Sequence, residues 1–486
     1  GGSHVLEGSV RKHNDNVLIT AQLIQANDEN LWADNFNEKL DNVFKIQSDV
    51  SKKIVEQLKI KLTPDEVKSI NKKATDNIEA YELYLKGRWY DGTKEGFTKS
   101  IDFLKQAISL DPNFADAYVE IAFTYLNHSV RGLMNYKDGL KEAKQYIDKT
   151  FSNDPKNTEA FQASVSYYST IQDYEKIKEN AEKAIALNPN NVDSRMLYAR
   201  YFTSIPIPEY DKYLEQIRIA QKIDPFSSYT NSSLINALLN IRKVKEAEEH
   251  YNKMKFTINK SQYAYIERRF KVYKNKDLTI EFNFIKERYD KNKKNPYLNS
   301  NLANQYLRIY NDYQKSYEYY KKAYELAPKS YSMSNKYFYS LLYVKKFDEA
   351  ENLLKDSKFM EVFNGDRHKY IYFDYHYYKG EFKEALTYLE KHEKNSQYYL
   401  NKGAIHAYLG DTEIVRNVLD NYATTYLNKS MIFAIQKNRD SMYYYMNKLI
   451  TPGSATGVNI YPEFDMYRKE PRFKEFLKYN FLPITE

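Results

Sequence analysis

The chain has 486 residues, 42% of them hydrophobic and 28% charged, a composition that excludes an intrinsically disordered protein. Its length corresponds to roughly three domains. Glycine and proline together supply only 27 residues, which argues against an all-β sandwich or barrel and favours helices. Cysteine is absent, so disulfides, cysteine-ligated zinc, iron–sulfur clusters and thiol nucleophiles are excluded.

Hydropathy indicates no membrane span in this chain. No stretch reaches the roughly 18 to 20 apolar residues that cross a bilayer. The first residues, GGSHV, have neither the basic start nor the apolar core of a signal peptide. We therefore expect a soluble chain, and any membrane anchor of the native protein would lie outside it. The compartment stays open between cytoplasm and periplasm.

Residues 5–39 alternate between apolar and polar positions, as strands do. In the segment VLITAQLI, Ile19, Ala21 and Leu23 lie on one face. Turn-forming residues separate this segment from its neighbours at 13–16 and 26–30. We predict a three-stranded antiparallel meander.

The period then changes to that of a helix. Val43, Ile46, Val50 and Ile54 recur at three- to four-residue intervals. The sequence TPDE at residues 63–66 forms a capping box with proline at the first helical position, so a new helix is expected to begin there. Three strands and one helix are a small core for an independent domain.

The N-terminal region resembles the second half of the TolB-like α/β domain of bacterial tetratricopeptide-repeat proteins. The resemblance is carried by VLEGSVRK (5–12), ITAQLI (19–24), LWA (31–33) and FKIQ (44–47), and by NIEAYELYLKGR (77–88) at the junction to the repeats. In that family the domain often follows an adenylate-cyclase or DNA-binding effector domain. The first half of the domain is absent here, so we expect either that the chain is a fragment or that another chain completes the sheet, since an unpaired edge would be sticky.

From residue 93 onward a unit recurs, ending in sequences such as IDFLKQAISLDP at Pro112 and EKAIALNP at Pro189. The marker prolines at 112, 155, 189, 225, 296 and 328 are separated by 43, 34, 36, 71 and 32 residues. A period near 34 is typical of tetratricopeptide repeats, which are paired helices. Two stretches, residues 261–295 and 424–451, carry the pattern only weakly.

The predicted fold is therefore mainly α: a tetratricopeptide-type α-solenoid superhelix preceded by a small α/β fragment of three antiparallel strands and a helix. We predict a partial TolB-like domain at 1–62, connecting helices at 63–92, about ten to twelve helical pairs at 93–451, and a C-terminal capping helix within 452–486. The amphipathic sequence PRFKEFL at residues 471–477 is the centre of that cap.

Catalytic and metal-binding motifs are not found. The sequence HEKNS at residue 392 lacks the second histidine of a zinc-protease helix, and the segment at 92–96 lacks the spacing of a phosphate loop. His368 and His376 are eight residues apart, too far for an ordinary chelating pair. We therefore predict no catalytic residues, no metal and no cofactor.

Binding is the remaining function. The family resemblance implies peptide contacts from outward-facing polar residues of the inner helices, and the candidates are Asn127, Ser166, Thr170, Arg200, Asn301, Gln305 and Arg308. The last three share one helical face. Ordinary solvated surface is the competing interpretation for each.

Positive charge is concentrated between residues 241 and 294, a segment that contains 16 Lys and Arg but only 8 Asp and Glu. The run includes Arg242, Lys243, Lys245, Arg268, Arg269, Lys271 and Lys274. It would attract an anionic partner, although a solvated helical face explains it as well. It lacks a nucleic-acid-binding motif, so no specific nucleic acid is predicted.

The leading hypothesis is a non-enzymatic interaction or scaffold module that docks a protein or peptide in the concave groove of the repeats. The alternative is a sensor or regulatory region of a larger signalling enzyme or transcription regulator. A third possibility is capture of a small ligand by the 49 tyrosines. A homodimer formed through the incomplete sheet is a further expectation.

Overall fold

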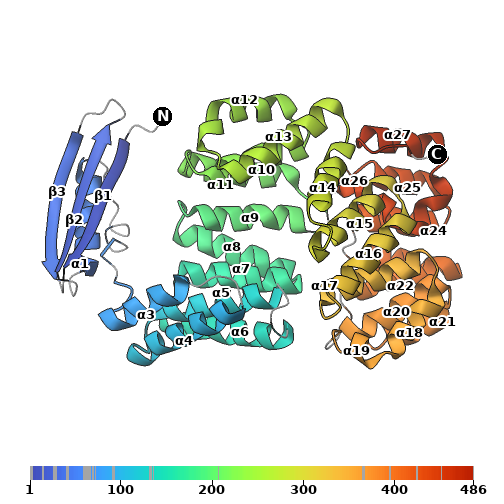
Figure 1. Cartoon of the computed structure of the whole chain (residues 1–486), viewed down its shortest axis with the longest axis horizontal. Helices are drawn as coiled ribbons and strands as arrows, with labels where there is room; N and C mark the ends of the chain where they lie inside the picture. The colour runs from blue at the N-terminus through green and yellow to red at the C-terminus, as the bar shows by residue number, and fades with distance from the viewer. Residues whose placement is uncertain are drawn as a thin grey trace. The chain divides into compact units, whose positions relative to one another are not determined.

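The computed structural model describes residues 4–13, 16–25, 30–39, 43–57, 67, 70–71, 73–89, 94–130, 134, 136–205, 207–363, 367–392, 394, 396–422, 425–449 and 451–484. It divides into two compact units, Gly1–Gln172 and Asp173–Glu486. Figure 1 labels the helices and strands of both. The helix start expected at residues 63–66 lies outside the described residues.

The N-terminal sheet has the predicted meander. Strands β1 (His4–His13), β2 (Asn16–Gln25) and β3 (Asn30–Lys39) pair antiparallel in the order β1-β2-β3, and α1 (Val43–Gln57) follows. Val17, Ala21 and Leu23 of β2 are buried with Ile46 of α1. Leu6 of β1 pairs with Leu23, so both lie on the same face, but Leu6 is 51% exposed.

The helices of unit 1 form two successive hairpins and a single helix. The hairpins are α3 (Ile78–Trp89) with α4 (Lys94–Leu110), and α5 (Ala115–Val130) with α6 (Tyr136–Asn153); α7 (Thr158–Ile171) follows. Small residues allow close approach: a Cβ on Gly87 would lie 2.6 Å from Leu104 Cγ. Leu104, Phe114, Ala117 and Ala143 are completely buried at these contacts.

Unit 2 continues the pattern with α8 and eight further hairpins. Their helices are α8 (Tyr174–Leu187), α9 (Val192–Ser204), α10 (Tyr210–Ile223), α11 (Ser228–Asn240), α12 (Val244–Met254), α13 (Lys260–Asn275), α14 (Thr279–Lys291), α15 (Pro296–Tyr310), α16 (Tyr313–Leu326), α17 (Tyr331–Tyr343), α18 (Phe347–Lys355), α20 (Arg367–Lys379), α21 (Phe382–Leu389), α22 (Ser396–Leu409), α23 (Thr412–Asn421), α24 (Tyr426–Ile435) and α25 (Arg439–Met446). Short helices η2 (Lys255–Thr257) and α19 (Ser357–Met360) lie between hairpins. The weakly patterned stretches also form helices, α13 with α14 and α24 with α25.

Local sequence sets the helix boundaries. Asn157, Asn191 and Asn295 cap helix N-termini by accepting a hydrogen bond from a backbone N–H three residues on. Pro296 is the first residue of α15. Within hairpins, the turn requires a left-handed backbone, which glycine supplies at Gly380 (φ +85°). Stacked helical hairpins of this kind are an α-solenoid, and the predicted fold class is confirmed.

The C-terminal residues fold into short helices that bury their aromatic side chains in unit 2. These helices are α26 (Pro452–Ala455), η3 (Thr456–Asn459), η4 (Pro462–Tyr467) and α27 (Pro471–Tyr479). Phe464, Phe473 and Tyr467 are completely buried in a core shared with Met442 and Tyr443 of α25. Across the described residues, none of the helices combines the length and apolarity that a bilayer crossing requires.

Candidate functional site

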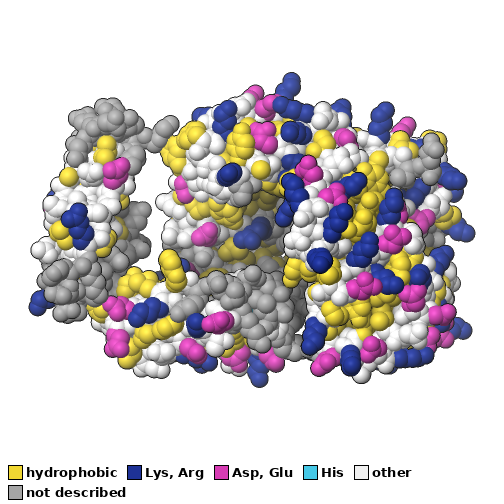
Figure 2. All heavy atoms as spheres, viewed as in Figure 1, with side chains coloured by type: hydrophobic (Ala, Val, Ile, Leu, Met, Phe, Trp, Pro, Cys, Tyr) yellow, Lys and Arg dark blue, Asp and Glu magenta, His cyan; other side chains and the backbone are white. Residues whose placement is uncertain are grey.

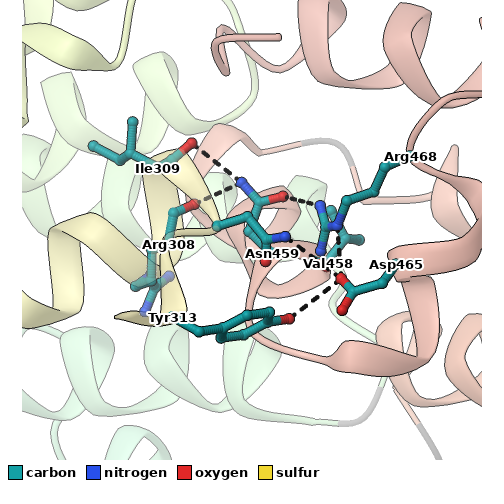
Figure 3. Close-up of polar contacts among 8 residues, drawn as sticks. Arg308, Ile309, Tyr313, Val458, Asn459, Asp465 and Arg468 are labelled. Atoms are coloured by element: carbon teal, nitrogen blue, oxygen red, sulfur yellow. Dashed lines mark hydrogen bonds and ion pairs between the residues drawn. The ribbon is translucent and has the colours of Figure 1, made fainter. Parts of the chain in front are cut away.

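The C-terminal segment of unit 2 returns to a hairpin that precedes it by about 150 residues. We call residues 456–468 the C-terminal brace (Figure 3). Arg308 at the end of α15 donates hydrogen bonds from Nε and Nη2 to Thr456 Oγ1, at 3.0 and 2.6 Å. Asn459 Nδ2 donates to the backbone oxygens of Arg308 and Ile309, at 3.0 and 3.3 Å. These carbonyls lie in the last turn of α15, where intrahelical donors run out.

Arg468 holds the brace in its own shape. Its guanidinium donates to Asn459 Oδ1 at 2.7 Å, to the Val458 oxygen at 3.0 Å and to Asp465 Oδ1 at 2.8 Å. The hydroxyl of Tyr313, the first residue of α16, donates to the same carboxylate at 3.3 Å. The brace is therefore tied to both helices of the α15–α16 hairpin by hydrogen bonds that include charged groups, which are the stronger kind.

A pocket of about 1140 Å³ lies where the brace and α27 meet helices α14, α15 and α16. Its lining consists of Phe282, Lys286, Tyr306, Tyr310, Asn311, Asp312, Tyr313, Gln314, Lys315, Val344, Asp465, Arg468, Lys469 and Lys474. Four of these side chains are aromatic and five are cationic, against two carboxylates. Figure 2 shows basic side chains lying among hydrophobic ones over the region where Figure 1 places α14 to α16.

The cations of this pocket differ in how they are neutralised. Arg468 and Lys315 form ion pairs with Asp465 and Asp312. Lys286, Lys469 and Lys474 are exposed and have no ion-pair partner within the described part of the chain. An excess of three positive charges therefore faces solvent beside the tyrosines of the pocket wall, which suits an anionic group with an apolar part.

The aromatic wall is built by stacking between hairpins. Phe282 packs edge-on against Tyr306 and Tyr310, at ring-centroid distances of 5.0 and 4.9 Å. Tyr306 stacks on Tyr319 at 5.5 Å. Burial raises the pKa of Tyr306 and Tyr310, so both remain neutral hydroxyls near pH 7.

The groove residues predicted in unit 1 lie on α5 and α7. Asn127 is exposed. Ser166 and Thr170 are half-buried, and their hydroxyls donate to the backbone oxygens of Gln162 and Ser166 on the same helix, at 3.1 and 2.8 Å. Because each hydroxyl already donates within its helix, each would offer a partner mainly an acceptor oxygen.

The groove residues predicted in unit 2 lie on α9 and α15. Arg200 and Asn301 are exposed and Gln305 is half-buried. Arg308 differs from the expectation of an outward-facing contact: the brace covers it, and burial lowers the pKa of its guanidinium. The cause is the return of the C-terminal segment, which no repeat pattern encodes.

The predicted basic region separates into arginines that stabilise the fold and lysines that face solvent. Arg242 donates to the Tyr479 oxygen and to Asn480 Oδ1, at 3.1 and 2.8 Å. Arg268 pairs with Glu281 at 2.7 Å, and Arg269 donates to Asn236 and Asn240. Lys274 pairs with Glu248 at 2.6 Å. Lys243, Lys245 and Lys271 are exposed.

The described residues contain no group of three or more His, Cys, Asp or Glu side chains that could bind a metal ion. The pocket lysines Lys286, Lys469 and Lys474 were not anticipated from the sequence. They come from α14 and from the end of the chain, and only the return of the brace brings them together.

Comparison with known proteins gives a partial likeness. No family model matches the chain. A 129-residue stretch, 26% of the chain, is 29% identical to "Putative adenylate cyclase 3" of Rhizobium meliloti (strain 1021). The chain spans about a fifth of the length of that curated relative, 22%.

Solved structures of MamA also resemble part of the chain. "Crystal structure of MamA" is 21% identical over 34% of this chain and 90% of its own, with a TM-score of 0.27. "MamA 41-end from Desulfovibrio magneticus RS-1" is 16% identical over 36% and 92%, also with a TM-score of 0.27. At such low TM-scores the assignment of an α-solenoid depends on the hairpins described above.

Proposed function

We propose that the chain is a non-enzymatic docking module, and that the pocket beside the C-terminal brace binds an acidic segment of a partner protein. The observation that carries this proposal is the set of three exposed lysines, Lys286, Lys469 and Lys474, without ion-pair partners among the described residues. They surround an aromatic wall in a pocket large enough for several side chains.

The chemistry of the pocket selects an acidic segment with aromatic or aliphatic side chains. The lysines attract carboxylates over a distance of about 10 Å at moderate salt. The faces of Tyr306, Tyr310 and Phe282 offer apolar contact once the segment is docked. Affinity should therefore fall as salt is raised, but should not vanish as it would for a purely electrostatic site.

The test is fluorescence anisotropy of the full chain with a labelled peptide of alternating Asp and Phe residues. The wild type is expected to bind it saturably. The triple variant Lys286→Glu, Lys469→Glu, Lys474→Glu should weaken binding at least about tenfold, since rim charges each contribute roughly 0.5 to 1 kcal/mol.

The basic region supplies a matched control with the same change in charge. The variant Lys243→Glu, Lys245→Glu, Lys271→Glu reverses three exposed lysines of unit 2 that do not line this pocket. It should bind the peptide as the wild type does, apart from a small long-range effect. Equal loss in both variants, or no binding by the wild type, would refute the pocket as the docking site.

The predicted groove residues remain a separate proposed contact in each unit, on α5 and α7 in unit 1 and on α9 in unit 2. The variant Asn127→Ala, Arg200→Ala removes two exposed polar side chains. A partner protein that uses either contact should bind this variant more weakly, whereas the short Asp–Phe peptide should bind it unchanged.

A second candidate function is regulation of a larger signalling protein. The partial identity with a protein named as a putative adenylate cyclase supports it, as does the resemblance of the N-terminal region to the TolB-like domain. Cyclase activity itself belongs to that relative. Sequencing the gene upstream of the codon for Gly1 tests the idea: a cyclase or DNA-binding domain supports it, and the absence of any effector domain contradicts it.

We also propose that two copies of the chain associate through the N-terminal sheet. Leu6 and Val10 of β1 are 51% and 68% exposed, and an edge strand with exposed apolar residues is prone to pairing. Light scattering should then give the mass of a dimer, and Val10→Lys should shift it toward the monomer. A monomer at all concentrations would contradict this proposal.

A further inference from the structure

Two carboxylates of unit 2 lie among tyrosines, and neither forms an ion pair within the described residues. Asp374 of α20 accepts a hydrogen bond from the Tyr339 hydroxyl of α17. Glu463 of η4 accepts one at Oε1 from the Tyr377 hydroxyl, at 2.8 Å. The other oxygen of Glu463, Oε2, is buried and has no hydrogen-bond donor among the residues that the structure describes. A buried carboxylate oxygen with an unmet acceptor is costly.

Tyrosine rings join the two carboxylates into one cluster. Tyr378 packs edge-on against Tyr343 and Tyr377, at 5.5 and 5.2 Å between ring centroids. Tyr343, Tyr378 and Tyr461 each interact electrostatically with both Asp374 and Glu463. The two carboxylates therefore share the same surroundings, although they lie 89 residues apart in the chain.

The side chains of the cluster are only partly buried. Asp374, Tyr343 and Tyr378 are half-buried, so each retains accessible surface. Tyr408, whose ring lies 5.9 Å from that of Tyr377, is 45% exposed. Tyr408 therefore forms a partly exposed edge of the cluster.

Within the described part of the chain, no positive charge compensates the two carboxylates. Burial raises the pKa of Asp374 to about 7, and the hydrogen bond from Tyr339 lowers it only in part. Burial also raises the pKa of Glu463, and hydrogen bonds from its own backbone and from Tyr377 lower it only in part, while the nearby carboxylate of Asp465 adds a smaller upward shift. No described lysine, arginine or histidine offsets the charge of either carboxylate.

We propose that this acidic tyrosine cluster binds an alkylammonium group. Ammonium supplies the donor that Glu463 Oε2 lacks and neutralises one or both carboxylates. The faces of Tyr343, Tyr377 and Tyr378 stabilise the methylene groups and the charge of an organic cation. A metal ion is a poorer match, because two carboxylates with tyrosine faces give too few oxygen ligands for calcium or magnesium.

The cluster lies beside the pocket described above, so two kinds of ligand can supply the ammonium group. Tyr343 lies 5.8 Å from Tyr313, which lines the basic pocket, and Glu463 is two residues from Asp465, which also lines it. The ammonium could belong to a free amine, or to a lysine of a peptide docked in the pocket. The cluster itself depends on neither the proposed peptide nor its binding.

The first experiment is isothermal titration of the full chain with putrescine in an amine-free phosphate buffer, with potassium chloride at equal ionic strength as the reference. Saturable binding of putrescine, absent with potassium, is expected. Asp374→Asn combined with Glu463→Gln should weaken it at least about tenfold, because both charges are lost while the shapes are kept. The exposed pair Asp348→Asn with Glu475→Gln is the matched control, and it should bind as the wild type does.

The second experiment distinguishes the sources. The Asp–Phe peptide is extended by one lysine at either end, and a version with acetyl-lysine is compared. Tighter binding of the lysine peptide, lost in the Asp374→Asn, Glu463→Gln variant, assigns the site to a peptide lysine; putrescine binding without that gain assigns it to a free amine. The proposal is wrong if the wild type does not bind putrescine saturably and also binds the lysine peptide no more tightly than the acetyl-lysine peptide. This result is independent of whether the Asp–Phe peptide without lysine binds.

Discussion

The two units consist of the same kind of helical hairpin, but the contacts that stabilise each unit internally differ. In unit 1 the helices pack on their neighbours in sequence, and the hydrogen bonds between helices span about one repeat, as from Asn157 to Asp116. In unit 2 the C-terminal residues also return to the turn after α11, to the start of α14 and to α15, with hydrogen bonds spanning 148 to 238 residues. A repeat array is normally a chain of nearest-neighbour contacts. The comparison shows that one terminal segment can add long-range contacts and a pocket to such an array.

The largest expected effect comes from emptying the core beneath the brace. Phe464→Ala and Phe114→Ala each delete a completely buried ring, one in each unit, and each should cost about 3 to 5 kcal/mol of stability. Hydrogen–deuterium exchange should separate them. Phe114→Ala should increase exchange only in α3 to α6, whereas Phe464→Ala should increase it in α24, α25 and also in α15. Unchanged exchange of α15 in Phe464→Ala would show that unit 2 is held together as locally as unit 1.

A smaller effect is expected when only the polar link is removed. Arg308→Met keeps most of the side-chain volume but leaves Thr456 without its two donors, and should cost about 1 to 3 kcal/mol in chemical denaturation. Arg200→Met, at an exposed position of α9 in the same unit, is the control and should change stability by less than about 0.5 kcal/mol. Equal stability of the two variants would mean that the brace contributes nothing.

The pH dependence of unit 2 follows from Asp374. Its pKa is about 7 in the folded protein against an ordinary 3.8, so the folded state binds the proton more tightly than the unfolded state. Stability should therefore fall as the pH rises from about 4 to about 7 and then level off. Asp374→Asn removes this loss, so in amine-free buffer it should exceed the wild type by about 1 to 2 kcal/mol at pH 8 and by much less at pH 5. A constant difference across this range in thermal melts would contradict the assignment.

The smallest expected effects concern single hairpin turns, which are local in both units. Lys345 adopts a left-handed backbone (φ +59°), as Gly380 does (φ +85°). Lys345→Gly should stabilise by about 0.5 to 1 kcal/mol, and Gly380→Ala should destabilise by about the same amount. Thermal melts should show these opposite shifts, and equal signs would indicate that the turns are not the source of strain.

The sequence predicted the parts of the fold that depend on local patterns. Alternation gave the three strands, and the spacing of prolines such as Pro189 gave the helical hairpins. The pocket could not be predicted in this way. Lys286 is separated from Lys469 and Lys474 by about 180 residues, and their approach depends on hydrogen bonds of Arg308 and Asn459 with no sequence signature. For the same reason Arg308 resembled a groove contact, since its helical face matches that of Asn301 and Gln305.

The most direct test of the docking pocket is hydrogen–deuterium exchange of the full chain with and without the Asp–Phe peptide. If the peptide binds in the pocket lined by Lys286, Lys469 and Lys474, exchange should slow in residues 282–315 and 465–474 and stay unchanged in unit 1. Protection confined to α5, α7 or α9, or no protection at peptide concentrations that saturate binding, would contradict it.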